Sequence, residues 1–418
     1  MGILKWKLQG SALFYAILIA TVVAILISVL ITITYYFQSI NNREELINRL
    51  NRNADSGMAI LLADQSRDSF TQMLDLFGDQ SDSVIIKKQP WGLFDIAHCK
   101  AFQTTNVGHL RVSQRTAMLG QVLKDKNVAL DLINGSKPLV VCGNTRVEGK
   151  AYLPQAGIKK GTIEGQSYQG KQLIYGSQHL GSETLPQLNY EKTNQVFEIS
   201  KKAPRNPINR LEDSIRVSFS DELMIIRDSV VNIQNHRLFG HILIRGDSIV
   251  RVSANSELED VIICAPIVEV ASHFEGQIQV FAHDIVRIEA NAQLKYPSVI
   301  TLAADYNRQD PLLFLEENAQ LDGFALLQRK SKYAPMPKMI CRKGSLVKGD
   351  IFSEGQLDLQ GNVFGTITAP GFNLRIGARQ YFNHLLNVTI SPKSRSKNYV
   401  RPLHLEKNDE NNIVKWLD

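Results

Sequence analysis

Cysteine is scarce in this chain of 418 residues. The four cysteines, Cys99, Cys142, Cys264 and Cys341, stand far apart in the sequence. None has a neighbour at the short spacing of a zinc-binding pair, and so few cysteines exclude a disulfide-stapled scaffold. We expect four small buried side chains. One long-range disulfide stays open for a chain that lies outside the cytoplasm.

A strong excess of one charge is also missing. Lys and Arg number 47 against 41 Asp and Glu, a net charge of +6. That balance is typical of an ordinary solvated surface, and no zinc finger, helix-turn-helix or aromatic RNA-binding motif accompanies it. Phosphate loops, dinucleotide fingerprints and GxSxG nucleophile motifs are absent as well. We therefore expect no nucleic-acid partner and no cofactor.

One long run lacks charge altogether. Residues 11–37, SALFYAILIATVVAILISVLITITYYF, carry no charged side chain. As a helix this run is about 40 Å long, enough to cross a hydrocarbon core of about 30 Å. The cores of signal peptides are shorter. The run predicts a single transmembrane helix, with the lipid bilayer as a partner.

Basic residues flank this predicted helix on both sides. Lys5 and Lys7 precede it, whereas Arg43, Arg49 and Arg52 follow it. Because a short basic tail before the first span usually stays in the cytoplasm, we expect a single-pass protein of the inner (cytoplasmic) membrane with its bulk periplasmic or extracellular. The alternative orientation faces the cytoplasm.

The amino-terminal region resembles the minor pilins of type IV pili and type II secretion. Residues 1–10, MGILKWKLQG, are similar to a basic prepilin leader that ends at Gly10, which implies cleavage before Ser11. Residues 38–67 continue with apolar positions at helical spacing, as a pilin stalk does. The chain departs from that family at Tyr15, where most pilins carry glutamate. The apolar stalk positions are Ile47, Leu50, Ala54, Met58 and Leu61 or Leu62.

An internal repeat occupies the centre of the chain. Similar segments begin at Ile249, Ile267, Ile285 and Leu312, the first three at intervals of 18 residues and the fourth after a loop at 303–311. Two or three short strands fill each interval, which predicts an all-β, single-stranded β-solenoid over 136–390. Parallel strands of successive turns then pair about 4.8 Å apart. Two ladders are expected to line the core: Ile249, Ile267, Ile285 and Leu312, and Val252, Val270, Ile288 and Leu315.

Glycine marks the later turns. GSLVKGDIFSEGQLDLQGNVFGTITAPG, residues 344–371, has a glycine every four to six residues with apolar residues between them. Glycine adopts the tight conformation of a corner at little cost. Residues 344–369 resemble the repeat of bactofilins, the polymer-forming bacterial cytoskeletal proteins. The resemblance implies a right-handed β-helix and self-association.

Shorter segments surround the predicted solenoid. Residues 68–135 are expected to be a mixed α/β connecting region with a short helix at 115–125. Residues near 181–212 contain prolines and charges and predict an excursion loop. Residues 391–418 predict a polar carboxyl-terminal tail, or a cap formed by its apolar end.

The acids of the repeat do not form a catalytic pair. Glu269 shares a position with Arg251 and Arg287, which predicts a ladder of alternating charge instead of the two facing carboxylates of a glycosidase. Asp247 and Asp284 precede their strands and are expected in turns.

The histidines also lack a functional pattern. His273 and His283 lie ten residues apart and have no metal-site partners nearby. Gly240-His241-Ile242 is only a fragment of the Gly-His-Gly pattern of polygalacturonases. We therefore expect no catalytic, cofactor-binding or metal-binding residue and no enzymatic activity.

The sequence as a whole predicts a non-enzymatic structural or scaffold protein of the cell envelope. Its expected partners are copies of itself, other envelope proteins or glycan. A minor pilin-like component of a pilus or secretion machine is the alternative, and a carbohydrate-binding or carbohydrate-active surface solenoid is a third possibility.

Overall fold

The computed structural model describes residues 9–66, 68–76, 78, 82–104, 110–305, 310–406 and 410–417. The fold is mostly β, with one long apolar helix at its amino-terminal side. It divides into two compact units. Unit 1 comprises residues up to Ala59 with Gln72–Ile86 and Cys99–Arg115, and unit 2 comprises Ile60–Thr71, Lys87–His98 and Thr116–Asp418. The basic residues Lys5 and Lys7 lie outside the described residues.

Helix α1 (Gln9–Ala63) contains the predicted membrane anchor and the predicted stalk as far as Ala63 without a break. By length and composition it is able to cross a membrane, and it is the one such helix among the described residues. In unit 1 the expected stalk face is largely confirmed, because Leu50, Ala54 and Met58 are buried. Ile47 departs from that face and is 41% exposed.

The described parts of residues 68–135 contain strands and no helix, so the helix expected at 115–125 is wrong. Most of that segment belongs to β4, which extends to Gln121. Residues 116–121 are all buried, and periodicity alone does not distinguish a short, fully buried strand from a buried helical segment. A five-stranded sheet has the order β1-β2-β3-β4-β33. Its strands are β1 (Phe70–Leu74), β2 (Asp82–Trp91), β3 (Phe94–Thr104), β4 (Leu110–Gln121) and β33 (Asn411–Trp416).

Most of the remaining strands of unit 2 form a parallel stack, in which strands of one repeat pair with those of the next. The predicted register is confirmed: Ile249 pairs with Ile267, Ile267 with Ile285, and Ile285 with Leu312. One further repeat precedes them, since β14 pairs in parallel with β16. The central strands are β13 (Ser214–Val217), β14 (Met224–Ile233), β15 (Arg237–Gly240), β16 (Ile242–Val252), β17 (Glu257–Glu259), β18 (Val261–Val270), β19 (Glu275–Gly276), β20 (Ile278–Ile288), β21 (Gln293–Ala304), β22 (Leu312–Leu315), β23 (Gln320–Arg329), β24 (Lys338–Cys341) and β25 (Leu346–Ser353).

One of the two expected core ladders lies on the outside. Val252, Val270, Ile288 and Leu315 are buried, but the Ile249 ladder is only half-buried. Side chains alternate between the two faces of a strand, so positions 249 and 252 cannot both point inward. The second inner ladder is instead formed by the residues next to Ile249 and its equivalents. These are Val231, Val250, Val268, Val286, Leu313, Met339 and Leu357.

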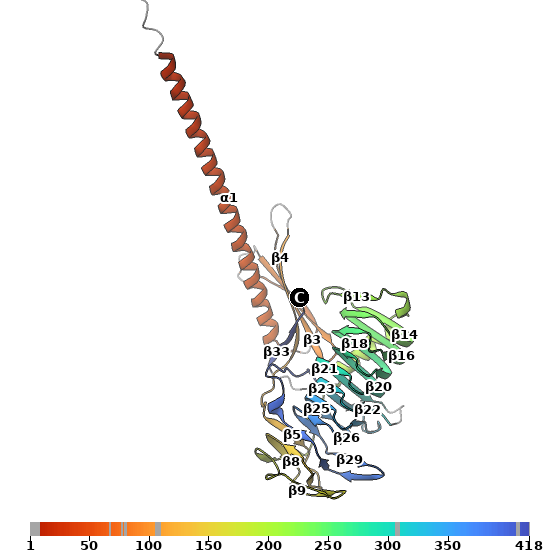
Figure 1. The fold of residues 1–418 in the computed structure, drawn as a ribbon. Coiled ribbons are helices and arrows are strands. Elements are labelled where there is room, and N and C mark those ends of the chain that lie inside the picture. Colours follow the sequence, from red (N-terminus) through yellow and green to blue (C-terminus); the bar gives the residue numbers. More distant parts are fainter. Residues whose placement is uncertain are drawn as a thin grey trace, which may run out of the picture. The chain divides into compact units, whose positions relative to one another are not determined.

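The repeats are not stacked in the order of the sequence. Strand β5 pairs with β28, and β7 pairs with β32, so residues 128–153 follow residues 367–390 in the stack. Figure 1 shows the yellow strands beyond the blue ones. The stacking order therefore differs from the order along the chain, and Val128–Leu132, which precedes the predicted range 136–390, also belongs to the stack. The strands at this end are β5 (Val128–Leu132), β6 (Leu139–Cys142), β7 (Arg146–Val147), β8 (Lys150–Leu153), β9 (Ile158–Lys160), β10 (Thr162–Ile163), β11 (Gln166–Ser167), β12 (Gln178–Leu180), β26 (Gln356–Leu359), β27 (Asn362–Val363), β28 (Ile367–Ala369), β29 (Asn373–Ile376), β30 (Arg379–Phe382), β31 (His384–Leu386) and β32 (Thr389–Ile390).

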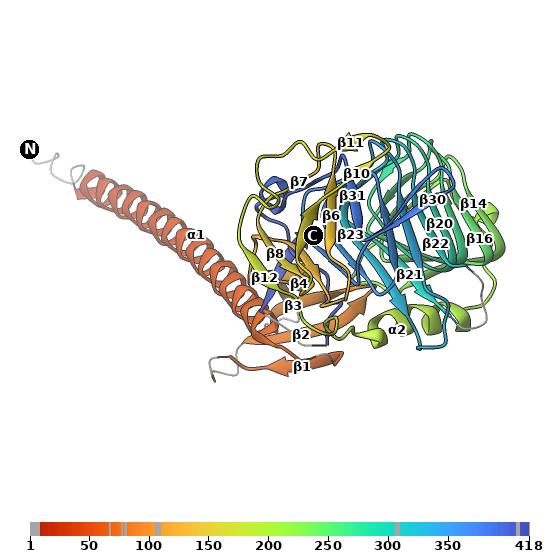
Figure 2. The same cartoon turned by 90° about the horizontal axis from the view of Figure 1, so that it is seen from below.

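The predicted excursion connects the two ends of the stack and contains a helix. Helix α2 (Tyr190–Lys202) lies against β16, β18 and β20, as Figure 2 shows along the side of the stack. Its buried residues include Val196, Phe197 and Ser200, at the spacing of one helical face. A 3-10 helix, η1 (Ile208–Arg210), follows it. The segment is thus not only a loop.

The carboxyl-terminal segment is not a free polar tail. Residues 391–406, called the strap below, run beside the stack with the 3-10 helix η2 (Pro392–Ser394) at their start. Arg395, Tyr399 and His404 are buried in the strap. Strand β33 then pairs antiparallel with β4. Because its apolar residues complete a sheet, they do not cap the last repeat.

Candidate interaction surfaces

The two outer surfaces of the central repeats differ. Residues of β16, β18, β23 and β25 that point away from the inner ladders are covered by α2, by the turn between β2 and β3, and by the strap. The strands under this layer therefore carry apolar side chains both towards the inner ladders and on this outer surface, called the covered face below. The segments that carry Ile249, Ile267 and Ile285 are covered by no such layer among the described residues, and their half-buried aliphatic side chains line an open face.

The predicted charge ladder lies on this open face. Arg251 pairs in register with Glu269, and Glu269 with Arg287. Arg251 Nε lies 3.0 Å from Glu269 Oε2, whereas Arg287 forms its ion pair with Glu316, also at 3.0 Å. The guanidinium of Arg287 also lies over the ring of Phe314. Glu269 is thus held in an ion pair with Arg251, as part of a ladder of charged side chains.

The two aspartates expected in turns lie inside strands. Asp247 belongs to β16 and Asp284 to β20, each at a point where the pairing register shifts. Asp247 accepts hydrogen bonds from Arg227 and Arg245. It therefore links neighbouring strands.

The two histidines noted in the repeat have separate surroundings. His273 occupies a turn with a positive φ of 63°. His283 stacks on Phe197 of α2 with ring centroids 3.9 Å apart. Among the residues that the structure describes, no three His, Cys, Asp or Glu side chains gather as a metal site requires. All four cysteines are buried and free.

One end of the stack is partly closed by the segment after α2. Asn206 and Arg227 exchange two backbone hydrogen bonds of 2.9 Å, and Ile208 inserts into the core. Pro204 and Pro207 flank Asn206 and have no N–H to offer a further strand. Strand addition at this edge is thereby disfavoured.

The opposite end carries an exposed strand edge. Among the described residues, the register of β12 is given by β8, with which it pairs in parallel. The backbone N–H of Ala151 donates to Ser177 and that of Gly181 donates to Leu153, so the intervening Gln178 and Leu180 turn their backbone groups away from β8. Leu180 is 61% exposed.

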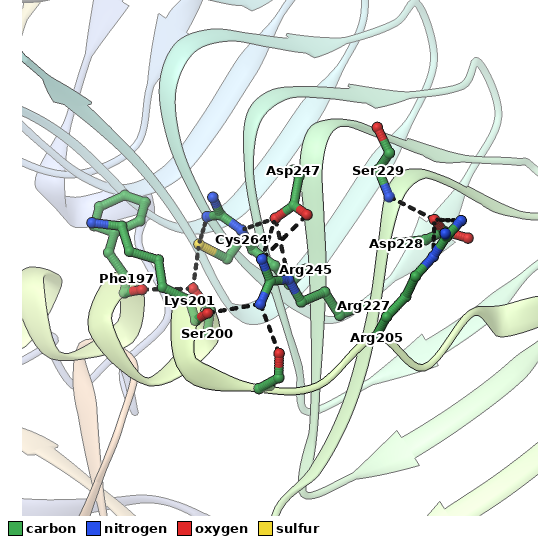
Figure 3. Close-up of polar contacts among 11 residues, drawn as sticks. Phe197, Ser200, Lys201, Arg205, Arg227, Asp228, Ser229, Arg245, Asp247 and Cys264 are labelled. Atoms are coloured by element: carbon green, nitrogen blue, oxygen red, sulfur yellow. Dashed lines mark hydrogen bonds and ion pairs between the residues drawn. The ribbon is translucent and has the colours of Figure 1, made fainter.

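Polar contacts lock α2 onto the covered face, as Figure 3 shows. Arg227 Nη1 donates to the carbonyl oxygens of Lys201 and Ala203, both at 2.7 Å, and its guanidinium also pairs with Asp247. The guanidinium thus satisfies carbonyl groups that a helix end leaves without partners. In the same last turn of α2, Ser200 Oγ lies 3.5 Å from the sulfur of Cys264.

A cleft of about 390 Å³ lies between α2, the end of β2 and the loop 220–223. Its floor and walls include Val196, Ile199, Leu243 and Ile262, and Lys87 and His241 also line it. Ile199 is 42% exposed, so part of this apolar lining meets solvent. All of these residues belong to unit 2.

The wall of the cleft at residues 91–93 is held by Gln279. Its side-chain oxygen accepts from the backbone N–H of Leu93, and its side-chain nitrogen donates to the carbonyl of Trp91, both at 3.0 Å. Gly92 has a φ of +64°, and a Cβ there would collide with the Gln279 amide. The turn therefore requires glycine and cannot relax easily.

His241 is fixed between two aromatic rings and one carbonyl. Its ring lies 4.9 Å from that of Trp91 and 5.3 Å from that of Phe219, and Nδ1 is 3.0 Å from the carbonyl oxygen of Asp221. Burial lowers the pKa of His241, which keeps the imidazole neutral. Since a carbonyl only accepts, Nδ1 carries the proton and Nε2 is an acceptor. The fragment around His241 gave no sign of this cleft in the sequence, because its partners lie far away along the chain.

No family model, curated protein or solved structure matches this chain.

Proposed function

We propose that this protein is a non-enzymatic, single-pass membrane-anchored scaffold of the cell envelope. In this proposal the parallel stack is a β-solenoid, right-handed like that of the bactofilins it resembles, and copies associate through the end that carries β12. The bulk of the chain faces the periplasm or the exterior.

The contrast between the two ends of the stack is the observation that supports this proposal best. A strand edge with unpaired N–H and C=O groups is a template for another chain. Prolines disfavour strand addition at the end near Asn206. At the other end, the charged side chains of Lys159 and Lys160 disfavour it at the exposed strand β9. Neither device protects β12, whose residues are Gln178, His179 and Leu180.

Anchoring favours such an association. Copies held by α1 in one membrane have a higher effective concentration than free copies, so a small interface is sufficient. The resulting assembly would present repeated open faces, with their aliphatic and charged ladders, to other envelope proteins or to glycan.

Sedimentation of the full chain in detergent micelles tests this proposal. We expect the wild type to form oligomers and Leu180→Lys, which places a charge on the open edge, to sediment as a monomer. Gln178→Pro removes an outward N–H and should act in the same way. Ser214→Lys is the matched control at the terminal strand of the opposite end and should leave the oligomers intact. A monomeric wild type, or oligomers in both β12 variants, would contradict the proposal.

The continuity of α1 favours a second candidate, a minor pilin-like component. Pilin-like proteins extend their membrane helix directly into a stalk, and α1 continues in this way to Ala63. This candidate requires removal of the leader before Ser11.

A further inference from the structure

The cleft beside α2 combines an apolar interior with two polar groups that lack partners. Leu243 and Ile262 lie in its floor, and Val196 and Ile199 line the side formed by α2. Volumes of this size accommodate small ligands in proteins. A ligand with a branched aliphatic side chain would bury that group against these four residues.

His241 supplies the first polar group. The side chain is only 8% exposed, and Nε2 has no hydrogen-bond partner among the described residues. Because Nδ1 is bound to Asp221, Nε2 is free to accept a hydrogen bond from an N–H or O–H group in the cleft. Because His241 lines the cleft, Nε2 is open to it, and a ligand N–H or O–H would take the place of water there.

Lys87 supplies the second polar group. Its ammonium lies near enough to His241 to disfavour the charged imidazole, and it has no ion-pair partner in the described part of the chain. The other lysine of the cleft, Lys192, is already paired with the buried Asp95. Lys87 is therefore the cation that remains for an anionic ligand group.

We propose that this cleft binds the carboxyl-terminal residue of a peptide when that residue is aliphatic, or an N-acylated aliphatic amino acid of the same chemistry. The carboxylate pairs with Lys87, the amide N–H donates to His241 Nε2, and the side chain lies against Leu243 and Ile262. Asp221 and Glu222 also line the cleft, and their charges oppose any carboxylate that is not paired with Lys87. This inference does not depend on the assembly proposed above.

A matched set of three small ligands tests each contact by calorimetry on the full chain in nanodiscs. N-acetyl-leucine carries the carboxylate, the amide N–H and the aliphatic group, N-acetyl-leucinamide lacks the carboxylate, and N-acetyl-glycine lacks the aliphatic group. We expect N-acetyl-leucine to bind at least tenfold more tightly than either of the others. Equal affinities for the three, or no binding of N-acetyl-leucine, would overturn the proposal without reference to any variant.

Variants then locate the site. Lys87→Gln should weaken N-acetyl-leucine at least tenfold and leave N-acetyl-leucinamide unchanged, whereas Lys160→Gln, at an exposed lysine of β9, should change neither. His241→Phe keeps an aromatic ring between Trp91 and Phe219 and should weaken both acetylated leucine ligands. Unchanged affinity in Lys87→Gln, with an unchanged thermal midpoint, would place the binding elsewhere and refute this site.

Discussion

Asp350 of β25 and Arg395 of the strap form a buried ion pair with an Oδ1–Nη1 distance of 2.6 Å. Their side chains are 3% and 4% exposed. The other carboxylate oxygen of Asp350 accepts from Arg401, and Arg395 Nη2 donates to the carbonyl of Lys126. One carboxylate thus ties together the last part of the chain, the centre of the stack and the segment before β5. The two guanidinium groups lower the pKa of Asp350 although burial opposes them.

Replacing Asp350 by Asn should cost about 3–5 kcal/mol of unfolding free energy, because the buried guanidinium of Arg395 and the half-buried guanidinium of Arg401 lose their counter-charge. Urea unfolding of the full chain in micelles, followed by circular dichroism, measures the change. Glu269→Gln is the control: it breaks the exposed pair with Arg251 and should cost about 1 kcal/mol or less. Similar losses in both variants would contradict the role given to Asp350.

Gly365 should be intolerant of a side chain. A Cβ at this position would lie 1.7 Å from the carbonyl oxygen of Gly349 in the neighbouring repeat. We expect Gly365→Ala to destabilise the protein by about 1–3 kcal/mol or more, as overpacking does. Gly135→Ala meets nothing within 4 Å and should be neutral. Thermal midpoints of the two variants compare them directly, and equal midpoints would refute the close approach of these repeats.

Removing the Arg227 guanidinium should loosen α2 selectively. We expect Arg227→Ala to expose the carbonyls of Lys201 and Ala203 and to cost about 1–2 kcal/mol, the scale of a lost charged hydrogen-bond group. Hydrogen exchange should rise in residues 190–202 and stay constant in β20. Arg205→Ala removes an arginine that is mostly exposed and should leave the exchange of α2 unchanged.

Lowering the pH should destabilise unit 2 already at pH values at which carboxylates are still ionised. Burial, with the nearby Arg401 charge, lowers the pKa of His404 to about 3, and burial lowers that of His283 to about 4. The unfolded chain binds protons near pH 6.5, so stability is full above that pH and falls as the pH drops toward these folded values.

Each of these histidines should lower the unfolding free energy by about 2 kcal/mol between pH 7 and pH 5. Urea unfolding at the two pH values measures this loss. His404→Phe should make the difference between the two pH values smaller. An equal difference in the wild type and in this variant would contradict a buried, neutral His404.

The orientation of the chain is testable with a tag after Asp418. We expect protease to remove the tag once the outer membrane is permeabilised, and not to require an opened inner membrane. Protection until the inner membrane is broken would place the bulk of the chain in the cytoplasm.

Mass spectrometry of the mature amino terminus distinguishes the two proposed functions. A start at Ser11 would establish prepilin-type cleavage and favour the pilin-like component. An uncleaved leader would remove that alternative and leave the scaffold.

Several features were readable from local patterns. The charge-free run predicted α1, and the repeat beginning at Ile249 predicted the parallel register of three successive neighbours. Both signals depend on short-range periodicity: a membrane helix needs a continuous apolar run, and stacked repeats need equivalent residues at equal intervals. The placement of the Ile249 ladder in the core was wrong because the repeat defines which residues align and does not define which face is inward.

The cleft was not predictable in the same way. Lys87, His241 and Ile199 come from three separate segments, and nothing near any of them in the sequence indicates the other two. The strap shows the same problem, since Arg395 lies in a polar stretch that looks solvated until Asp350 is found beside it.

The sequence by itself therefore determined the apolar helix, the predominance of strands and the interval and register of the central repeats, because each follows from residues close together in the chain. Only the tertiary structure decided that residues 128–153 follow residues 367–390, that α2 and the strap cover one face, and that β12 keeps an open edge. Those features depend on contacts between segments that are not neighbours along the chain. The free energies of these contacts come from burial and charge pairing, which produce no periodic pattern in the sequence.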